Sequence, residues 1–283
     1  MENIKYNILN RCFTKNWIQG CINDNNPTYD EIIRRYIPAS TDKTNMELIE
    51  SIYSLMLNNY RNEYIYKNTL INKLLLKKHS LKTTTALSEF QIAGSIADMI
   101  MINGRGIVYE IKTELDNYDR LDGQINDYYK AFSYVYIVTH KNNMKSLMQI
   151  LDTINPNVGI LVFNRTAFTE YRKASCYNEL LDKEVIFKIL RKHEFENVIM
   201  ASGFALPSCS QFKYYQECKA IFNEIPIDKL QKLSLETLKA RSRVTDDEIA
   251  LIPDEMKFLC YSMNIKDKDR LLIDEFLNSK YKE

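Results

Sequence analysis

The chain has 283 residues, 45% of them hydrophobic and 27% charged, and its 38 basic side chains almost balance its 37 acidic ones. This composition is typical of a soluble globular protein, and the net charge of +1 excludes a chain-wide basic field that would by itself attract nucleic acid. The sequence contains no apolar segment of membrane length and no pattern of a secretory signal. We therefore expect a cytoplasmic protein with no membrane partner.

The six cysteines are scattered without a Cys-x-x-Cys pair, which disfavours a zinc ribbon and a disulfide framework. We expect reduced thiols in the core. The sequence also lacks a Walker-type phosphate loop, a Gly-x-Ser-x-Gly elbow and the histidine spacing of a metal site.

Residues 1–59 are predicted to form a helical cap. Helices are expected over 5–21, 28–36 and 45–56, the second opened by Thr28 as its N-cap. A module of this size could bind DNA as a helix-turn-helix, but it has no glycine-containing turn and no basic recognition helix. The pattern favours a cap that packs on the following domain.

The next predicted elements are a helix over 61–78 and a first strand over 87–92. Beyond them, two short apolar runs, 96–102 and 106–111, flank an Asn-Gly dipeptide. Asn-Gly between apolar runs is the strongest short-range signal for a β-hairpin. We therefore expect these two runs to be neighbouring antiparallel strands.

This hairpin carries charges where a buried strand should be apolar. Asp98 lies in its first strand, and Glu110 and Lys112 lie in its second. Since side chains alternate along a strand, Glu110 and Lys112 point the same way. We expect two acids and a lysine to converge on one face.

A carboxylate among apolar strand residues is costly to bury unless it is paired, and a divalent cation bound by Asp98 and Glu110 would pair both. Mg²⁺, or Mn²⁺ in its place, suits such a site because it prefers oxygen ligands and keeps positions for water and phosphate. Lys112 could then orient or deprotonate an attacking water, or stabilise the phosphate as charge builds.

A longer pattern contains these residues: Asp98, then Glu110-Ile111-Lys112, then Gln124 and Tyr128. It resembles the D…ExK…QxxxY signature of the PD-(D/E)XK nuclease superfamily, in the subgroup with a Gln-x-x-x-Tyr helix after the catalytic strand. The chain departs from the motif in having alanine before Asp98, where the superfamily has proline. The likeness covers roughly residues 60–164, and within the superfamily it is to an uncharacterised bacterial family known only by a locus tag.

The resemblance implies roles for these residues. Asp98 and Glu110 would hold the metal, with the main-chain carbonyl of Ile111 as a further ligand, and Lys112 would position water. The matching glutamine and tyrosine of the superfamily brace the site and contact the substrate backbone. For Gln124 and Tyr128 the alternative is a helix that packs through its tyrosine and displays its glutamine to water.

Two more acids have two readings each. In the superfamily, a helix before the first core strand often lends a glutamate to the metal site, and Glu63 matches that position. The alternative is an exposed glutamate that pairs with Lys67, four residues on. Glu89, in the first strand, is either a further ligand to metal or water or a charge at the strand edge.

After the hairpin, a helix over 119–134 is followed by apolar strands at 134–139 and 159–164, with a helix over 144–154 between them. A strand, helix and strand with continuous apolar strands imply a parallel crossover. Together these elements predict a restriction-endonuclease-like α/β core, a mixed sheet flanked by helices.

The remaining chain is predicted to be a helical accessory domain. Expected helices are 178–192, 211–223, 227–242, 245–263 and 267–282. Its best basic patches are the run Lys239, Arg241 and Arg243 and the cluster Arg191-Lys192-His193. Aromatic residues at Phe212, Tyr214 and Tyr215 could stack on bases, although tyrosines on a helix more often pack.

The domain organisation expected from the sequence is therefore 1–59, an N-terminal helical cap, 60–164, a nuclease-like core, and 165–283, a C-terminal all-α region. The function expected is a metal-dependent nuclease that hydrolyses phosphodiester bonds in DNA, in phage defence or DNA processing. Two rivals remain open: a catalytically silent DNA-binding or regulatory subunit, and a helical immunity-type protein that binds a protein partner. The sequence leaves the oligomeric state undecided.

Overall fold

A computed structural model describes residues 6–23, 25–37, 42–114, 116–241, 244–250, 252–263 and 267–282. The chain forms two compact units: the first joins Met1–Lys77 to Val244–Glu283, and the second is Lys78–Arg243. None of the described helices is long and apolar enough to cross a membrane.

The first unit is helical. Its elements are η1 (Asn7–Arg11), α2 (Lys15–Ile22), α3 (Pro27–Tyr36), α4 (Asn45–Asn59), α5 (Glu63–Leu70), the π-helix η2 (Ile71–Leu76), α12 (Asp246–Ala250), η4 (Asp254–Met256), α13 (Lys257–Met263) and α14 (Asp267–Asn278).

Capping decides where the first helices begin, and it corrects two predictions. The single helix expected over 5–21 is split, because Thr14 caps α2 by accepting a hydrogen bond from the Trp17 amide. The cap of α3 is Asn26, with Pro27 at the first helical position, and not Thr28. Thr44 opens α4 with a capping box.

The C-terminal segment returns to the N-terminal helices, so the units differ from the three segments expected. The Tyr64 hydroxyl donates to the Glu255 carbonyl at 2.7 Å, and Asn45 Nδ2 donates to Ser279 Oγ at 3.0 Å. These contacts join residues about 190 and 234 positions apart in the chain. Helical periodicity carries no information about such pairing.

The second unit is built on a six-stranded mixed sheet in the order β1-β2-β3-β4-β5-β6. The strands are β1 (Thr85–Ile92), β2 (Ser95–Ile102), β3 (Gly106–Lys112), β4 (Tyr134–His140), β5 (Gly159–Asn164) and β6 (Ala167–Arg172). The first three strands are antiparallel, β3, β4 and β5 are parallel, and β6 is antiparallel to β5. This confirms the predicted mixed sheet, hairpin first and parallel strands after it.

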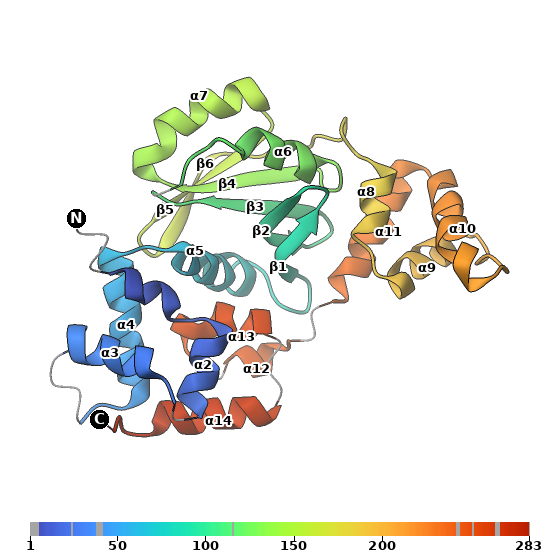
Figure 1. The fold of residues 1–283 in the computed structure, drawn as a ribbon. Helices are drawn as coiled ribbons and strands as arrows, with labels where there is room; N and C mark the ends of the chain where they lie inside the picture. The colour runs from blue at the N-terminus through green and yellow to red at the C-terminus, as the bar shows by residue number, and fades with distance from the viewer. Residues whose placement is uncertain are drawn as a thin grey trace. The chain divides into compact units, whose positions relative to one another are not determined.

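Helices α6 (Leu121–Tyr129) and α7 (Met144–Ile154) follow β3 and β4 and pack on one face of the sheet (Figure 1). Helices α8 (Lys183–Lys188), α9 (Lys192–Ala201), α10 (Gln211–Glu224) and α11 (Ile227–Lys239) gather beside the β1–β2 end, as Figure 1 shows. Their apolar side chains continue the core under α6. The helix expected over 178–192 is in fact α8 and the first residue of α9.

The cysteine prediction is correct in part. All six cysteines are free, and four of them are buried. Cys176 and Cys209 are exposed, so the expectation of core thiols is wrong for these two.

Candidate active site

Glu110 is the centre of the candidate site. It lies in β3, a strand that the parallel partner β4 and the antiparallel partner β2 hold on both sides. Its side chain is only 3% exposed, and both of its carboxylate oxygens accept hydrogen bonds. A buried carboxylate is tolerated only when such donors replace the water it has lost.

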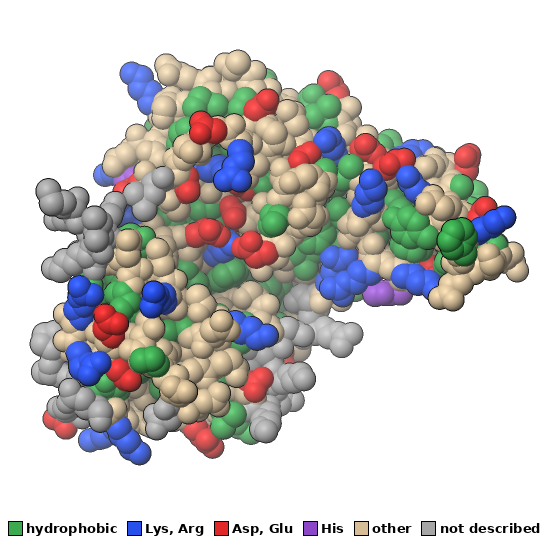
Figure 2. Space-filling view, viewed as in Figure 1, with side chains coloured by type: hydrophobic (Ala, Val, Ile, Leu, Met, Phe, Trp, Pro, Cys, Tyr) green, Lys and Arg blue, Asp and Glu red, His purple; other side chains and the backbone are tan. Residues whose placement is uncertain are grey.

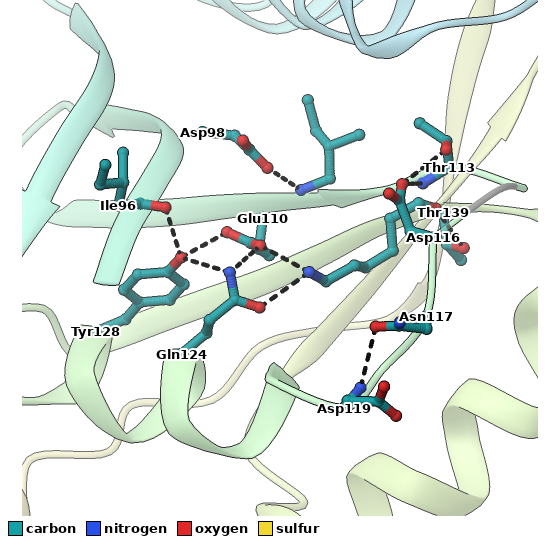
Figure 3. A network of polar contacts seen from close by, with 12 residues as sticks. Ile96, Asp98, Glu110, Thr113, Asp116, Asn117, Asp119, Gln124, Tyr128 and Thr139 are labelled. Atoms are coloured by element: carbon teal, nitrogen blue, oxygen red, sulfur yellow. Dashed lines mark hydrogen bonds and ion pairs between the residues drawn. The ribbon is translucent and has the colours of Figure 1, made fainter. Parts of the chain in front are cut away.

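Lys112 and Gln124 close a ring with Glu110 (Figure 3). Lys112 Nζ lies 3.0 Å from Glu110 Oε1 and 2.9 Å from Gln124 Oε1, while Gln124 Nε2 donates to Glu110 Oε1 at 2.6 Å. The ammonium has only donors and the carboxylate only acceptors, so the glutamine amide fits in one orientation. The alternation predicted for Glu110 and Lys112 is present, since the two side chains meet.

Tyr128 holds the other oxygen of Glu110. Its hydroxyl lies 2.6 Å from Glu110 Oε2 and 2.9 Å from the carbonyl of Ile96 in β2. Burial, and then the charge of Glu110, raise the pKa of Tyr128 far above its usual value, and the charge of Asp98 acts in the same direction. Tyr128 therefore remains a protonated donor.

The helix α6 places Gln124 and Tyr128 on one side because they are four residues apart. Asp127, on the same helix, accepts hydrogen bonds from the Gly94 amide at 3.1 Å and from Ser95 Oγ at 2.8 Å. Gly94 lies in the two-residue connection between β1 and β2, and Ser95 is the first residue of β2. Asp127 thus fixes the β1–β2 hairpin against the helix that carries the other two side chains.

Asp98 contacts the strand that carries Glu110. Its Oδ2 accepts a hydrogen bond from the Ile111 amide at 2.6 Å. The β2–β3 ladder ends at the pair Met99 and Tyr109, so Asp98 and Glu110 come directly after it. The Asp98 carboxylate therefore accepts a main-chain hydrogen bond from β3 just beyond the point where the main-chain pairing of β2 and β3 stops.

Glu89 lies opposite Asp98, between the cross-strand pairs Ser88–Met99 and Phe90–Ala97. Carboxylate oxygens of the two residues approach within 4.8 Å. Like charges directly opposite each other in a sheet are destabilising, so the two acids suit a shared cation. Whether Glu89 is a ligand or a charge at the strand edge stays a prediction.

Strict alternation breaks at this pair of acids. Ala97 and Ile100 both face the core under α6. They are three positions apart, and strict alternation would place them on opposite faces of the strand. The change of phase coincides with a φ of +50° at Glu89, a left-handed conformation that is rare for a residue other than glycine. At this point Glu89 is exposed and Asp98 is half-buried. Neither the phase change nor the strain has a signal in the sequence.

Glu63 is the first residue of α5, in the first unit, and its side chain is half exposed. It forms an ion pair with Lys67, whose own side chain is 5% exposed. This is the pairing that the sequence offered as the alternative to a metal ligand. A contribution of Glu63 to the site stays a prediction.

The donor set can be tested for a hard divalent ion. Glu110 Oε1 already accepts from Lys112 and Gln124, which use both of its lone pairs, whereas Oε2 keeps one. Asp98 Oδ2 accepts from the Ile111 amide. Oxygens of Asp98 and Glu89, with Oε2 of Glu110, are therefore the atoms that fit Mg²⁺ or Mn²⁺ chemically.

Fold and site define an α/β protein in which a buried acid, a lysine and a glutamine are joined on a mixed sheet. The chain belongs to the family described as bacteriophage P4 protein cII, whose model matches residues 56–252. The family description does not name the PD-(D/E)XK superfamily, so that resemblance stays a prediction.

One relative is Protein cII of Enterobacteria phage P4, which is 23% identical over 181 residues. The match covers 62% of this chain and 66% of that protein, just under two thirds of its length. Among solved structures, one match is the SPO1766 protein of unknown function from Silicibacter pomeroyi, with 16% identity and a TM-score of 0.29. The match covers 38% of this chain and 73% of the SPO1766 chain. That score is too low to carry an argument.

Proposed function

We propose that this chain is a Mg²⁺-dependent nuclease of the PD-(D/E)XK type that hydrolyses phosphodiester bonds in DNA. The observation that carries the proposal is the ring of Glu110, Lys112 and Gln124, closed by Tyr128 and located one strand from Asp98. These are the residues of the resembling motif, and they come from two strands and one helix.

The candidate ligands are Asp98, Glu89 and Oε2 of Glu110, with the carbonyl of Ile111 as the further ligand that the resemblance implies. Mg²⁺, when bound, would supply Lewis-acid stabilisation of the phosphate and lower the pKa of a bound water. For Glu89 this takes the first of the two roles that the sequence left open, a further ligand to metal or water.

Lys112 would act on the attacking water and on the phosphate charge. Its side chain is 12% exposed, and the contacts to Glu110 and Gln124 fix the position of its ammonium. A donor held in advance stabilises developing charge without reorganising during the reaction. Gln124 and Tyr128 would be positioning residues, since they act through Glu110 and Lys112.

The relative from phage P4 is compatible with a phage-related setting; the role in phage defence or DNA processing comes from the sequence expectation alone. One observation favours a second candidate function, a DNA-binding subunit without turnover. Every donor around Glu110 is already engaged, as in a structural ion-pair network. Metal-independent DNA binding with no product would support this second candidate.

The test is cleavage of linear, circular and single-stranded DNA by the purified protein with Mg²⁺ or Mn²⁺. We expect cleavage that EDTA and Asp98→Ala abolish. Asp228→Ala is the matched control, because Asp228 is an exposed aspartate in the first turn of α11. Cleavage that survives Asp98→Ala would contradict the proposal.

A further inference from the structure

The ends of α9 and α10 carry exposed aromatic and basic side chains together. We call this surface the α9–α10 face; its residues are Arg191, Lys192, His193, Phe212 and Lys213, all exposed. Figure 2 shows basic side chains and a histidine below apolar side chains over these helices. Phe212 is 95% exposed, the largest value among the exposed large hydrophobic residues.

Phe212 is not needed for packing. The inner face of α10 is made by Tyr215, Cys218 and Phe222, of which the last two are fully buried. Tyr215 makes edge-to-face contacts with Phe187 and Phe195, with ring centroids 5.1 and 6.0 Å away. Phe212 lies one turn before Tyr215 and outside this cluster, so its ring is offered to a partner.

Contacts between the two helices bring the basic residues to the aromatic ones. Lys192 Nζ lies 4.9 Å from the centre of the Tyr214 ring, and the Tyr214 hydroxyl donates to Glu196 Oε1 at 2.8 Å. The first turn of α9 therefore lies beside the first turn of α10. Lys213 follows Phe212 directly in sequence.

The acids near this face are largely engaged within the protein. Glu194 is 2% exposed and bonded through both oxygens to Arg241, and Glu196 interacts with Tyr214 and Lys192. Glu217, one turn beyond Lys213, is the exposed acid of this part of α10. The face is therefore positive where Phe212 is exposed.

We infer that the α9–α10 face binds a single-stranded segment of nucleic acid, with a base stacked on Phe212 and phosphates beside Lys192 and Lys213. An exposed ring among lysines matches the two features of a single strand, an open base face and a charged backbone. A base paired in a duplex offers its face only to its neighbours in the stack. The inference rests on the proposed function and names the form of its substrate.

The test measures binding without cleavage. Fluorescence anisotropy with a labelled oligothymidine strand in EDTA compares the full chain with Phe212→Ala, Lys192→Ala and Lys213→Ala. We expect Phe212→Ala to weaken binding about fivefold or more, and each lysine variant to lower the salt dependence by about 0.7 in the slope of log K against log salt. Tyr171→Ala, at a half-exposed aromatic on β6, and Lys145→Ala, at an exposed lysine of α7, should change neither.

Unchanged binding in Phe212→Ala would overturn the inference, as would a duplex that binds as tightly as the single strand. An oligouridine strand whose binding depends on Phe212 to the same degree would support a face that binds single-stranded RNA as well as single-stranded DNA. Mn²⁺-dependent hydrolysis of bis(p-nitrophenyl) phosphate separates this inference from the proposed function, because so small a diester does not need the α9–α10 face. If the small diester is not hydrolysed but binding of the oligothymidine strand still depends on Phe212, only the proposal of nuclease activity is refuted.

Discussion

Tyr128 and its neighbour Tyr129 provide a matched pair of substitutions. Both side chains are fully buried in α6. The Tyr128 hydroxyl lies 2.6 Å from the buried Glu110 carboxylate, whereas the Tyr129 hydroxyl has no hydrogen-bond partner among the described residues. Replacing each with phenylalanine removes one oxygen from the same helix, so the two variants differ in the bond that is lost.

The expected cost of Tyr128→Phe follows from the acceptor. A hydrogen bond to a charged group contributes about 1.5–3 kcal/mol, and Glu110, at 3% exposed, has little water to replace it. We therefore expect Tyr128→Phe to lower the free energy of unfolding of the second unit by about 2 kcal/mol. Tyr129→Phe should be neutral or slightly stabilising, because it removes an unsatisfied buried hydroxyl.

Amide hydrogen exchange in the β3 peptide 106–114 measures this difference. A loss of about 2 kcal/mol corresponds to roughly a 30-fold fall in protection. Trp17 is the one tryptophan of the chain and belongs to the first unit, so its fluorescence reports a unit that neither variant touches. Equal protection in the two variants would refute the assignment of Tyr128 as a donor to Glu110.

Three further substitutions probe the same unit. Lys112→Met should lower the free energy of unfolding by about 2–4 kcal/mol, because it leaves the buried Glu110 carboxylate without its cation. Adding Glu110→Gln should recover much of this loss in a double-mutant cycle measured by amide hydrogen exchange. Additive losses would contradict the pairing. For Asp127, burial raises the pKa, but hydrogen bonds from Lys130, Ser95 and Gly94 outweigh burial and lower it. The stabilisation by Asp127 is thus present above its unfolded pKa and lost as pH falls through its folded pKa. Asp127→Asn should therefore remove part of the loss of stability below about pH 4. Parallel pH profiles of amide exchange in the wild type and Asp127→Asn would refute this. Glu194→Gln should cost about 3 kcal/mol by leaving Arg241 buried without its carboxylate, and thermal unfolding that matches the wild type would count against it.

The sequence predicted the β2–β3 hairpin and the helix α6 because their signals are local. Asn-Gly predicted the connection, although the observed loop has three residues, Asn103–Arg105, with Gly104 at a φ of +67°. Alternation placed Glu110 and Lys112 on one face, and helical spacing placed Gln124 and Tyr128 on one side. Each of these statements concerns residues a few positions apart.

The parts that were missed depend on contacts between distant residues or on small backbone departures. The edge strand β6 has mostly exposed side chains, so it lacks the apolar pattern by which β5 was predicted. The left-handed conformation of Glu89, which accompanies a one-residue phase shift in β1, and its position directly opposite Asp98 were not predicted, although Glu89 itself was named as a candidate ligand. The return of α14 to α4 was equally absent from local patterns.

The central claim is that Lys112, beside Glu110 and one strand from Asp98, supports metal-dependent hydrolysis of DNA. The most direct measurement is the single-turnover rate of cleavage of labelled DNA with saturating Mg²⁺ for the wild type, Lys112→Ala and the exposed control Lys145→Ala. The account predicts cleavage by the wild type and Lys145→Ala, and a loss of at least about a hundredfold in a folded Lys112→Ala protein. Cleavage by Lys112→Ala at the wild-type rate, or no cleavage by the wild type on any DNA, would contradict it.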